Sequence, residues 1–248
     1  MAYGVSIEND AGRVVISNAQ YCTAFIGNAT FTGTAKPLSY SAFGVTPISG
    51  SGDPFYIYQI NSVYPPMAFL QLTDARFLIC SIQNVGGNTW EIVVGGPNWS
   101  AIPIIKCFSR MVGQGGPGTG LRVRDNAGNR TWDSTEKMLI IRRKLDFAQA
   151  ANTSPEDIHQ EESLTGVAAP YLMSSSGINT PLLNGRDFVA GPGSQNTISV
   201  YAAGWALVDG VLSRSSRSMR AYRYLDDTTQ RDNTLGADRC YIINGNEY

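Results

Sequence analysis

Charged residues are scarce in this 248-residue sequence, because Asp, Glu, Lys and Arg together make up only 16% of it. Soluble globular proteins contain about 25%. The formal net charge is −1, so the chain as a whole has no attraction for nucleic acid or for anionic membrane surfaces. We therefore expect no nucleic-acid partner.

Long hydrophobic runs are also absent. No apolar stretch approaches the roughly 20 residues that a membrane-spanning helix needs, which predicts no membrane insertion. The first residues, Met-Ala-Tyr-Gly-Val, have neither the basic start nor the apolar core of a secretory signal. These absences predict a protein that is made in the cytoplasm and either stays there or is assembled there into a larger particle.

Histidine and closely spaced cysteines are equally rare. His159 is the only histidine, and the cysteines Cys22, Cys80, Cys107 and Cys240 show no Cys-x-x-Cys spacing. Since zinc sites need such clusters, no metal site is predicted. We interpret the cysteines as buried, reduced thiols that pack as small hydrophobic groups. A disulfide is the alternative if the protein meets an oxidising medium.

Few residues suit catalysis or cofactor binding. Nucleophilic catalysis by serine or cysteine needs a neighbouring base, but His159 lies beside Gln160-Glu161-Glu162, where we expect a solvated surface residue. The glycine-rich stretch 113–120 lacks the Gly-Lys-Ser/Thr ending of a phosphate-binding loop and is interpreted as a linker. The sequence thus predicts neither a cofactor site nor a nucleophile–base pair.

Paired carboxylates of the glycosidase type are harder to judge, because a spatial pair leaves no mark in a sequence. Turn or strand-end chemistry explains each acidic candidate. These candidates are Asp53, Asp74, Glu91, Asp187 and Asp209. We therefore predict a protein that is not an enzyme and has no catalytic, cofactor-binding or metal-binding residues.

Two residue patterns could serve binding. Arginine recurs at every third position in Arg214, Arg217, Arg220 and Arg223. Guanidinium groups suit phosphate or acidic sugars, but on a strand this period places successive arginines on opposite faces, so a subunit interface or a solvated face is favoured.

Aromatic residues form the second pattern. Exposed tyrosine and tryptophan suit sugar stacking or protein contact, although at least half of the candidates are expected in the core. The candidates are Tyr56, Tyr58, Tyr64, Trp90 and Trp99.

What the sequence has in abundance is turn and strand residues, with 26 glycines, 12 prolines and 12 tyrosines. Strands are predicted at Phe55–Ile60, at Ile102–Phe108 with Pro103 near a sheet edge, and at Met138–Ile141, which is apolar enough to be buried on both faces. The pattern predicts an all-β fold of one or two β-sandwich-like domains with many hairpins.

One short helix is predicted near residues 154–164. Ser154 suits the N-cap, Pro155 suits the first helical position, and an acidic residue follows three positions after the cap. Gly166 would end the segment. We interpret it as a linker helix or a surface cover.

A hairpin design occurs twice. In residues 120–134, Leu121 and Val123 alternate with arginines before an Asp-Asn-Ala-Gly turn, as in a β-hairpin. Residues 4–17 follow the same pattern after a shift of 116 positions, from Gly4 to Gly120. The sequence does not decide whether the two hairpins share a sheet.

The domain boundary is expected between residues 113 and 166. Our division places a β-sandwich domain with both hairpins at residues 1–145, a linker with the short helix at 146–165, and a second β region at 166–248. The glycine-rich stretch 113–120 connects the preceding strand to the second hairpin.

The hairpin resembles a motif of small bacteriophage tail-tip or fibre-associated minor tail proteins of long-tailed phages. The residues that carry this resemblance are Tyr3-Gly4-Val5-Ser6-Ile7 with Ala11-Gly12, and Gly120-Leu121-Arg122-Val123 with Ala127-Gly128 and Asp133-Ser134. The likeness covers residues 1–145. It implies a structural virion component, located in the tail and assembled in the cytoplasm of the bacterial host, and it carries over no catalytic residue.

The implied partners are other phage tail proteins and further copies of the chain, with a trimer favoured. The main alternative is a receptor-binding tail protein, in which residues 146–248 form a lectin-like or pilus-binding surface for the bacterial host. A glycan-cleaving tail enzyme is a third, disfavoured interpretation, because the sequence shows no catalytic constellation.

Overall fold

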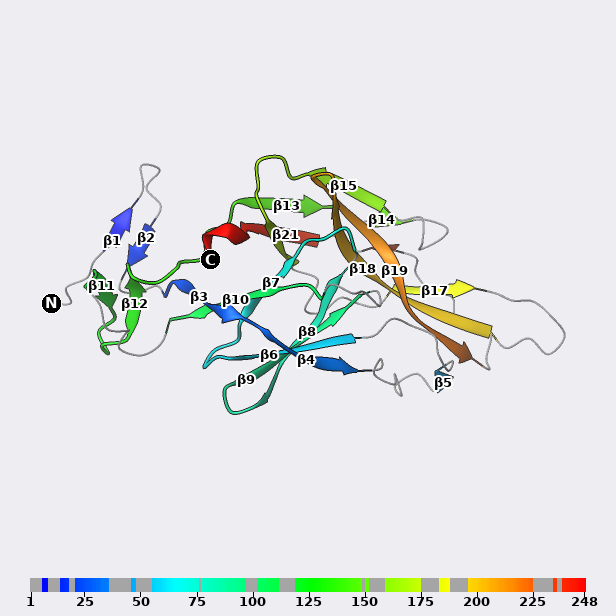
Figure 1. Ribbon diagram of the computed structural model, residues 1–248, viewed down its shortest axis with the longest axis horizontal. Helices are drawn as coiled ribbons and strands as arrows, with labels where there is room; N and C mark the ends of the chain where they lie inside the picture. Colours follow the sequence, from blue (N-terminus) through cyan, green and yellow to red (C-terminus); the bar gives the residue numbers. More distant parts are fainter. Residues whose placement is uncertain are drawn as a thin grey trace.

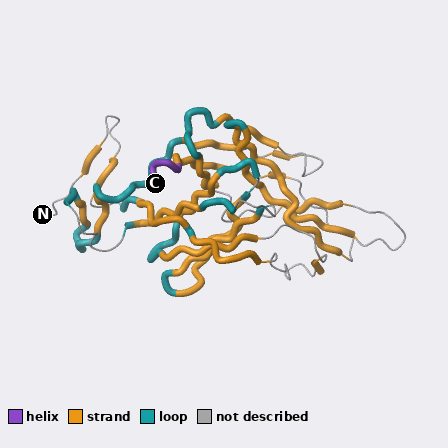
Figure 2. The backbone as a smooth tube through the Cα atoms, in the orientation of Figure 1, coloured by secondary structure: helices purple, strands orange, loops and turns teal. Residues whose placement is uncertain are grey.

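The structure, a computed structural model, is built almost entirely from antiparallel β-strands (Figure 1). Figure 2 shows one short helical turn near the C-terminus, the 3₁₀ turn Gly245–Glu247, and it is the only helical element in the described residues. The all-β fold class predicted from the sequence is confirmed. The structure describes residues 6–8, 14–17, 21–35, 46–47, 55–75, 77–96, 102–111, 119–148, 150–151, 159–174, 183–187, 196–224, 234–235 and 238–248.

The centre of the molecule is a six-stranded sheet with the order β13-β21-β16-β7-β10-β3. Its strands are β3 (Thr23–Asn28), β7 (Met67–Gln71), β10 (Ile105–Arg110), β13 (Arg143–Phe147), β16 (Pro170–Ser174) and β21 (Asp238–Asn244). Because β7 pairs with β16, the hydrogen-bonded sheet runs across both predicted domain limits, at residues 145 and 166. The division at these residues stays a prediction about folding units.

One segment joins the two sides of this sheet. Its first part pairs with β3, where Met138 forms an antiparallel bridge with Ala24. Its second part pairs with β21, starting at Arg142, whose N–H donates to the Ile242 carbonyl over 2.8 Å, and continuing along β13. Residues 137–147 therefore close the sheet on itself.

The inside of this closed sheet is filled with aromatic side chains, since alternate residues of each strand point inward. The ring of Phe108 is fully buried, and its centroid lies 5.3 Å from that of Phe69, 5.4 Å from Phe25 and 4.7 Å from Tyr248. The inner cluster consists of Phe69, Phe108, Tyr171 and Ile243, with Phe25, Met67, Leu139, Met173, Tyr241 and Tyr248 packed around them. Each aromatic pair contributes about 0.5–1.5 kcal/mol beyond its area burial.

Tyr248 fastens residues 137–142, which we call the strap, to this inner cluster. Its hydroxyl accepts a hydrogen bond from the Ile140 N–H over 2.7 Å and donates one to the Met138 carbonyl over 3.1 Å. Tyr248→Phe keeps the ring and removes both bonds, so we expect the free energy of unfolding to fall by about 1–2 kcal/mol. Urea titration measures this change. An unchanged midpoint with an unchanged slope would mean that the hydroxyl does not hold the strap.

Two further sheets lie on the outside of the closed sheet. The first has the order β4-β6-β9-β8, and the second has the order β15-β19-β18-β17 with β5 also paired to β19. The strands of the first are β4 (Thr30–Ala35), β6 (Phe55–Asn61), β8 (Leu78–Gly86) and β9 (Thr89–Gly95). Those of the second are β5 (Thr46–Pro47), β15 (His159–Ser163), β17 (Leu183–Asp187), β18 (Asn196–Val208) and β19 (Val211–Tyr224).

A reciprocal backbone contact joins these two outer sheets. The Phe77 N–H donates to the Trp205 carbonyl over 3.1 Å, and the Trp205 N–H donates to the Phe77 carbonyl over 2.9 Å. The two sheets therefore continue one another around the closed sheet.

Six short strands form three separate two-stranded sheets. The pairs are β1 (Ser6–Glu8) with β2 (Val14–Ser17), β11 (Arg122–Arg124) with β12 (Arg130–Asp133), and β14 (Ala150–Ala151) with β20 (Thr234–Leu235).

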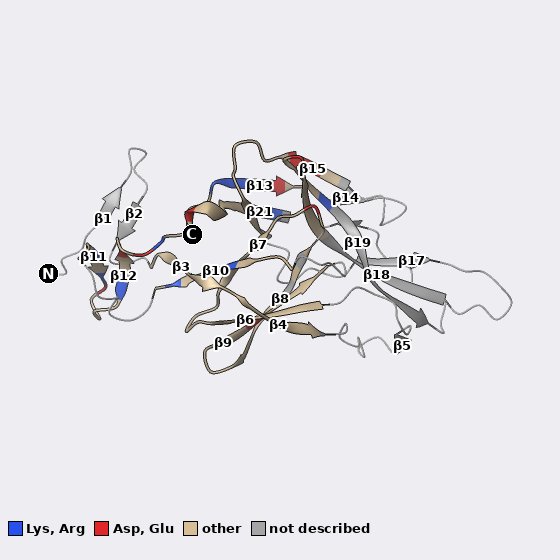
Figure 3. Cartoon of the chain, viewed as in Figure 1, with Lys and Arg blue, Asp and Glu red and all other residues tan. Residues whose placement is uncertain are grey.

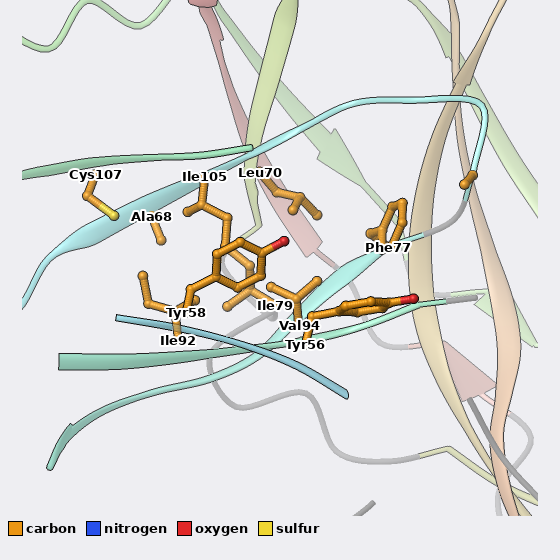
Figure 4. Packing of buried hydrophobic residues seen from close by; sticks show 11 residues of the cluster. Tyr56, Tyr58, Ala68, Leu70, Phe77, Ile79, Ile92, Val94, Ile105 and Cys107 are labelled. Atoms are coloured by element: carbon orange, nitrogen blue, oxygen red, sulfur yellow. The ribbon is translucent and has the colours of Figure 1, made fainter. Parts of the chain in front are cut away.

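Hydrophobic clusters fill both outer contacts. Figure 4 shows the first, in which Leu70 and Ile105 of the closed sheet meet Tyr58 and Ile92 of the four-stranded sheet. The second lies against the other outer sheet and contains Leu72, Phe147, Leu164, Leu172, Trp205, Leu212, Cys240 and Ile242. The closed sheet thus has packed side chains on its inner and outer sides, as in a sandwich.

The cysteines fit this packing. Cys107 and Cys240 are fully buried, and burial raises the pKa of the Cys107 thiol to about 12. Cys22 is half-buried, and the side chain of Cys80 lies outside the described residues. The burial of Cys107 and Cys240 agrees with the small-hydrophobe interpretation.

The helix predicted near residues 154–164 is wrong where the structure describes it. Residues His159–Ser163 form β15, which pairs along its length with residues 211–215 of β19. Residues 152–158, which include the predicted cap at Ser154, lie outside the described residues. Pairing with a long neighbouring strand outweighs local helix signals of about 1 kcal/mol each.

Two strand predictions also need correction. Met138–Ile141 is not a doubly buried strand, since it belongs to the strap and exposes Ile140 by 44% and Ile141 by 39%. Pro103 precedes β10, which lies between β7 and β3 and not at a sheet edge. In both cases the partners come from distant parts of the chain.

Candidate assembly site

Both predicted hairpins are present, and Figure 1 shows them together at the N-terminal end of the molecule, apart from the closed sheet. Strand β2 is a neighbour of β12. Each hairpin is nevertheless a two-stranded sheet of its own, which answers the question whether they share one. We call residues 6–8, 14–17 and 119–136 the hairpin module.

The two hairpins have the same strand register. The pairs are Ser6–Ser17, Ile7–Ile16 and Glu8–Val14 in the first hairpin, and Arg122–Asp133, Val123–Trp132 and Arg124–Arg130 in the second. Every pair of the second lies 116 positions after its counterpart, and the bulge falls after the second pair in both. Because bulges are placed features of a strand pair, the sequence repeat is also a repeat of structure.

Asp125 organises the turn of the second hairpin. Its carboxylate accepts hydrogen bonds from the N–H groups of Ala127 and Asn129, over 2.9 and 2.8 Å, and from the Asn129 side-chain amide over 2.9 Å. Gly128 has a φ of 85°, a conformation that favours glycine. The Asp-Asn-Ala-Gly sequence therefore forms the predicted turn through this aspartate.

A buried ion-pair group holds the two strands together. The carboxylate of Asp133, which is fully buried, accepts from Arg122 over 2.8 Å, from Arg130 over 3.0 Å and from the Thr135 hydroxyl over 2.6 Å. Arg130 also pairs with Glu136 over 2.8 Å. Burial on its own would raise the pKa of Asp133, but the bonds from Thr135 and the two arginines outweigh it and hold this pKa well below its usual range. The carboxylate is thus charged and structural.

Aromatic and charged side chains join the module to the closed sheet. The Tyr21 hydroxyl donates to Asp125, and the guanidinium carbon of Arg110, at the end of β10, lies 3.2 Å from the ring centroid of Tyr21 and 4.6 Å from that of Tyr64. Such cation–π contacts are worth about 0.5–2 kcal/mol each. The Cys22 N–H also donates to the Thr131 carbonyl over 2.9 Å. The module is therefore attached through specific side chains.

The attachment should weaken in acid. Hydrogen bonds from Tyr21 and then Asn129 lower the pKa of Asp125 from 3.8 to about 2. A carboxyl group whose pKa falls on folding contributes stability above about pH 4, and this contribution is lost as the pH falls towards 2. We expect Trp132 fluorescence to report a transition in this range that Asp125→Asn flattens. A profile identical in both proteins would contradict the role given to Asp125.

Three of the acidic candidates lie in described parts of the structure, and the turns that contain Asp74 and Asp209 are neighbours, because the Leu207 N–H donates to the Thr73 carbonyl over 2.6 Å. Asp74 lies in the turn between β7 and β8, Glu91 on β9 accepts from Gln83 over 2.8 Å, and Asp209 lies in the β18–β19 turn. His159 and Asp187 are backbone members of β15 and β17 whose side chains are outside the described part. Asp53 and residues 113–118 of the glycine-rich stretch are also outside it.

The arginine series is not a uniform surface. Arg214 is buried, donates to the Gln160 side chain over 3.1 Å and lies 5.6 Å from the Trp205 ring, so the predicted interface or solvated position does not apply to it. The side chains of Arg217, Arg220 and Arg223 lie outside the described residues. A bulge in β19 at Met219, between the pairs Val200–Arg220 and Tyr201–Ser218, also breaks the strict alternation on which the opposite-face prediction depended.

The aromatic candidates belong mainly to the interior. Tyr56 and Tyr58 are buried in the first outer cluster, Tyr64 contacts Arg110, and the Trp90 indole N–H donates to the Ser62 carbonyl over 2.8 Å. Trp99 is outside the described residues. Of the four described candidates, Tyr56 and Tyr58 are in the core, which agrees with the expectation that at least half of these rings are buried.

The sequence did not predict that the Lys106 side chain is buried. Lys106 lies inside the closed sheet between the rings of Phe25 and Tyr171, at 5.5 and 5.2 Å, and donates to the Tyr248 main-chain oxygen over 3.4 Å. Burial lowers the pKa of Lys106. The available signal was a single lysine within the apolar run Ile104-Ile105-Lys106-Cys107-Phe108.

Comparison with protein-family models, curated proteins and solved structures found no match. In the part of the chain that the structure describes, no group of three or more His, Cys, Asp and Glu residues is placed to hold a metal ion. None of the described helices is long and apolar enough to cross a membrane. The candidate site is the hairpin module, defined by its repeated strand register, and the surface beside it.

Proposed function

We propose that the protein is a structural component of a phage tail tip or of a tail-fibre attachment, and that it acts by assembling with neighbouring subunits. The observation that carries this proposal is the hairpin module, in which one hairpin design is used twice in the same register. The sequence likeness to minor tail proteins includes Ser6 and Ile7 of the first hairpin and residues 120–123, 127–128 and 133–134 of the second. The buried charges of the second hairpin bind one another, which suits a scaffold.

The surface beside the module supports subunit contact. Leu121 in the module is 61% exposed, and Ile140 and Ile141 of the strap are 44% and 39% exposed. Exposed apolar side chains in a chain with little charge suit contact with a protein partner. We propose other tail proteins and further copies of the chain as these partners, with a trimer as the favoured homo-oligomer.

Co-purification tests this function. The chain, expressed with the other tail proteins of the phage that encodes it, should capture at least one of them, and Leu121→Glu should reduce the capture at least tenfold. Val208→Glu is the matched control, because Val208 is 51% exposed in the distant β18–β19 hairpin. Capture of no tail protein by the unchanged chain, or equal capture by both variants, would contradict the proposal.

A receptor-binding role is the second candidate. The observation that favours it is the long hairpin of β18 and β19, of 13 and 14 residues, whose open end, where β18 begins and β19 ends, reaches away from the closed sheet on the side opposite the hairpin module (Figure 1). In that case the purified protein should coat host cells and protect them from infection. Deleting residues from this hairpin's far half should then abolish protection and leave co-purification with tail proteins unchanged.

A further inference from the structure

Strand β4 lies at the edge of the four-stranded sheet and contains no charged residue. Its sequence is Thr30-Phe31-Thr32-Gly33-Thr34-Ala35, and among the described strands it pairs only with β6. Thr30, Phe31, Thr32 and Thr34 are exposed. A strand in this position presents a row of backbone N–H and C=O groups that can pair with another chain.

The opposite edge of the joined outer sheets is β15, and it is protected by charged side chains and by contact with another segment, as edge strands commonly are. Strand β15 carries Glu161 and Glu162, and its Gln160 side chain donates to the Ala148 carbonyl over 3.0 Å. Figure 3 shows charge on β15 and on the adjacent β13, whereas β4 carries none. The protecting feature on β4 itself is a bulge at Thr32.

We infer that β4 pairs edge to edge with β4 of a second copy of the chain, in an antiparallel two-fold contact. Antiparallel pairing of this strand with itself opposes only Thr, Phe, Gly and Ala, so no register places like charges together. The Phe31 side chain is 37% exposed, although its ring centroid lies 5.6 Å from that of Tyr58. Pairing with a second β4 would bury more of this side chain. A two-fold contact of this kind is the commonest basis of homo-oligomers.

This inference deepens the proposed function by naming one partner, and it rests on that function only in requiring subunits to associate. A two-fold contact is also compatible with the favoured trimer, because two trimers joined by two-fold axes form a closed particle. Loss of the β4 contact should therefore halve the mass of the particle, whatever the other contacts are.

Light scattering on the full chain tests the inference. Thr34→Lys places a charge on the exposed edge and should halve the measured mass at equal protein concentration. Thr34→Val keeps a β-branched residue at the same position and should leave the mass unchanged. Thr30→Lys, at the other end of the strand, repeats the test if Thr34→Lys does not fold, as judged by its thermal transition.

The outcomes are distinct for the two proposals. A wild-type mass that neither lysine variant changes, including a monomer of 26.8 kDa, would overturn the edge contact. If such variants still capture tail proteins, the edge inference fails and the proposed function survives. If the lysine variants halve the mass but the chain captures no tail protein, the edge contact survives and the tail function fails.

Discussion

Asp133→Ala is expected to unfold the second hairpin locally, with a loss of about 3–5 kcal/mol in the stability of that element. The substitution removes a fully buried carboxylate to which Arg122, Arg130 and Thr135 all donate. Arg130, which is buried, would lose one of its two ion pairs and keep Glu136, and Arg122 would lose its contact with the Asp133 carboxylate. Removing one partner of a buried ion pair is strongly destabilising.

Hydrogen exchange measures this effect directly. The amides of residues 122–124 and 130–133 should lose protection in Asp133→Ala, while those of the closed sheet keep it. Asp133→Asn keeps the shape and one acceptor, so we expect an intermediate loss. Asp74→Ala, at an exposed turn position, is the control and should change stability by less than about 0.5 kcal/mol. Normal protection in Asp133→Ala would show that the buried ion pairs do not hold the hairpin.

Phe108→Ala should destabilise the whole protein by about 3–5 kcal/mol. The Phe108 side chain is fully buried at the centre of the inner cluster, where the rings of Phe69, Phe25 and Tyr248 surround it. Its removal leaves a cavity inside a closed sheet, whose walls cannot collapse without breaking backbone pairing.

Urea denaturation measures the loss in Phe108→Ala. Phe108→Leu retains most of the volume, so it should lose less than half as much stability. Phe31→Ala is the matched aromatic control, because Phe31 is 37% exposed at the edge strand. A loss in Phe108→Ala no larger than in Phe31→Ala would contradict the packing described for the closed sheet.

Local signals made the hairpins predictable. The Asp-Asn-Ala-Gly turn and the alternation of Leu121 and Val123 are contained within one 15-residue window, and the repeat is seen by comparing two such windows 116 positions apart. Turn residues fix the register of a hairpin, so the pairing of these strands required no knowledge of the rest of the chain.

Closure of the six-stranded sheet was not predictable in this way. It depends on Met138 meeting Ala24 and on Arg142 meeting Ile242, contacts between residues about a hundred positions apart. Without these contacts, the apolar residues of Met138–Ile141 indicated a buried strand, and the acidic segment 154–164 indicated a helix. Tertiary pairing decided both.

The candidate site was predictable only in part. The module's residues were recognised as a repeat, but the sequence did not show that Asp133 and Arg130 are buried and paired. A charged residue in a strand is usually exposed, and only the spatial neighbourhood of Arg122, Thr135 and Glu136 explains the exception.

Electron microscopy of antibody-labelled particles tests the proposed assembly function most directly. If the proposed function holds, antibodies against this chain, applied to purified particles of a phage whose genome encodes it, should label the tail tip or the fibre attachment of intact tails. Label should appear at this one position and should be absent from particles made without the gene, which should have incomplete tails. Complete, infectious particles that carry no label and contain none of the chain by mass spectrometry would contradict it.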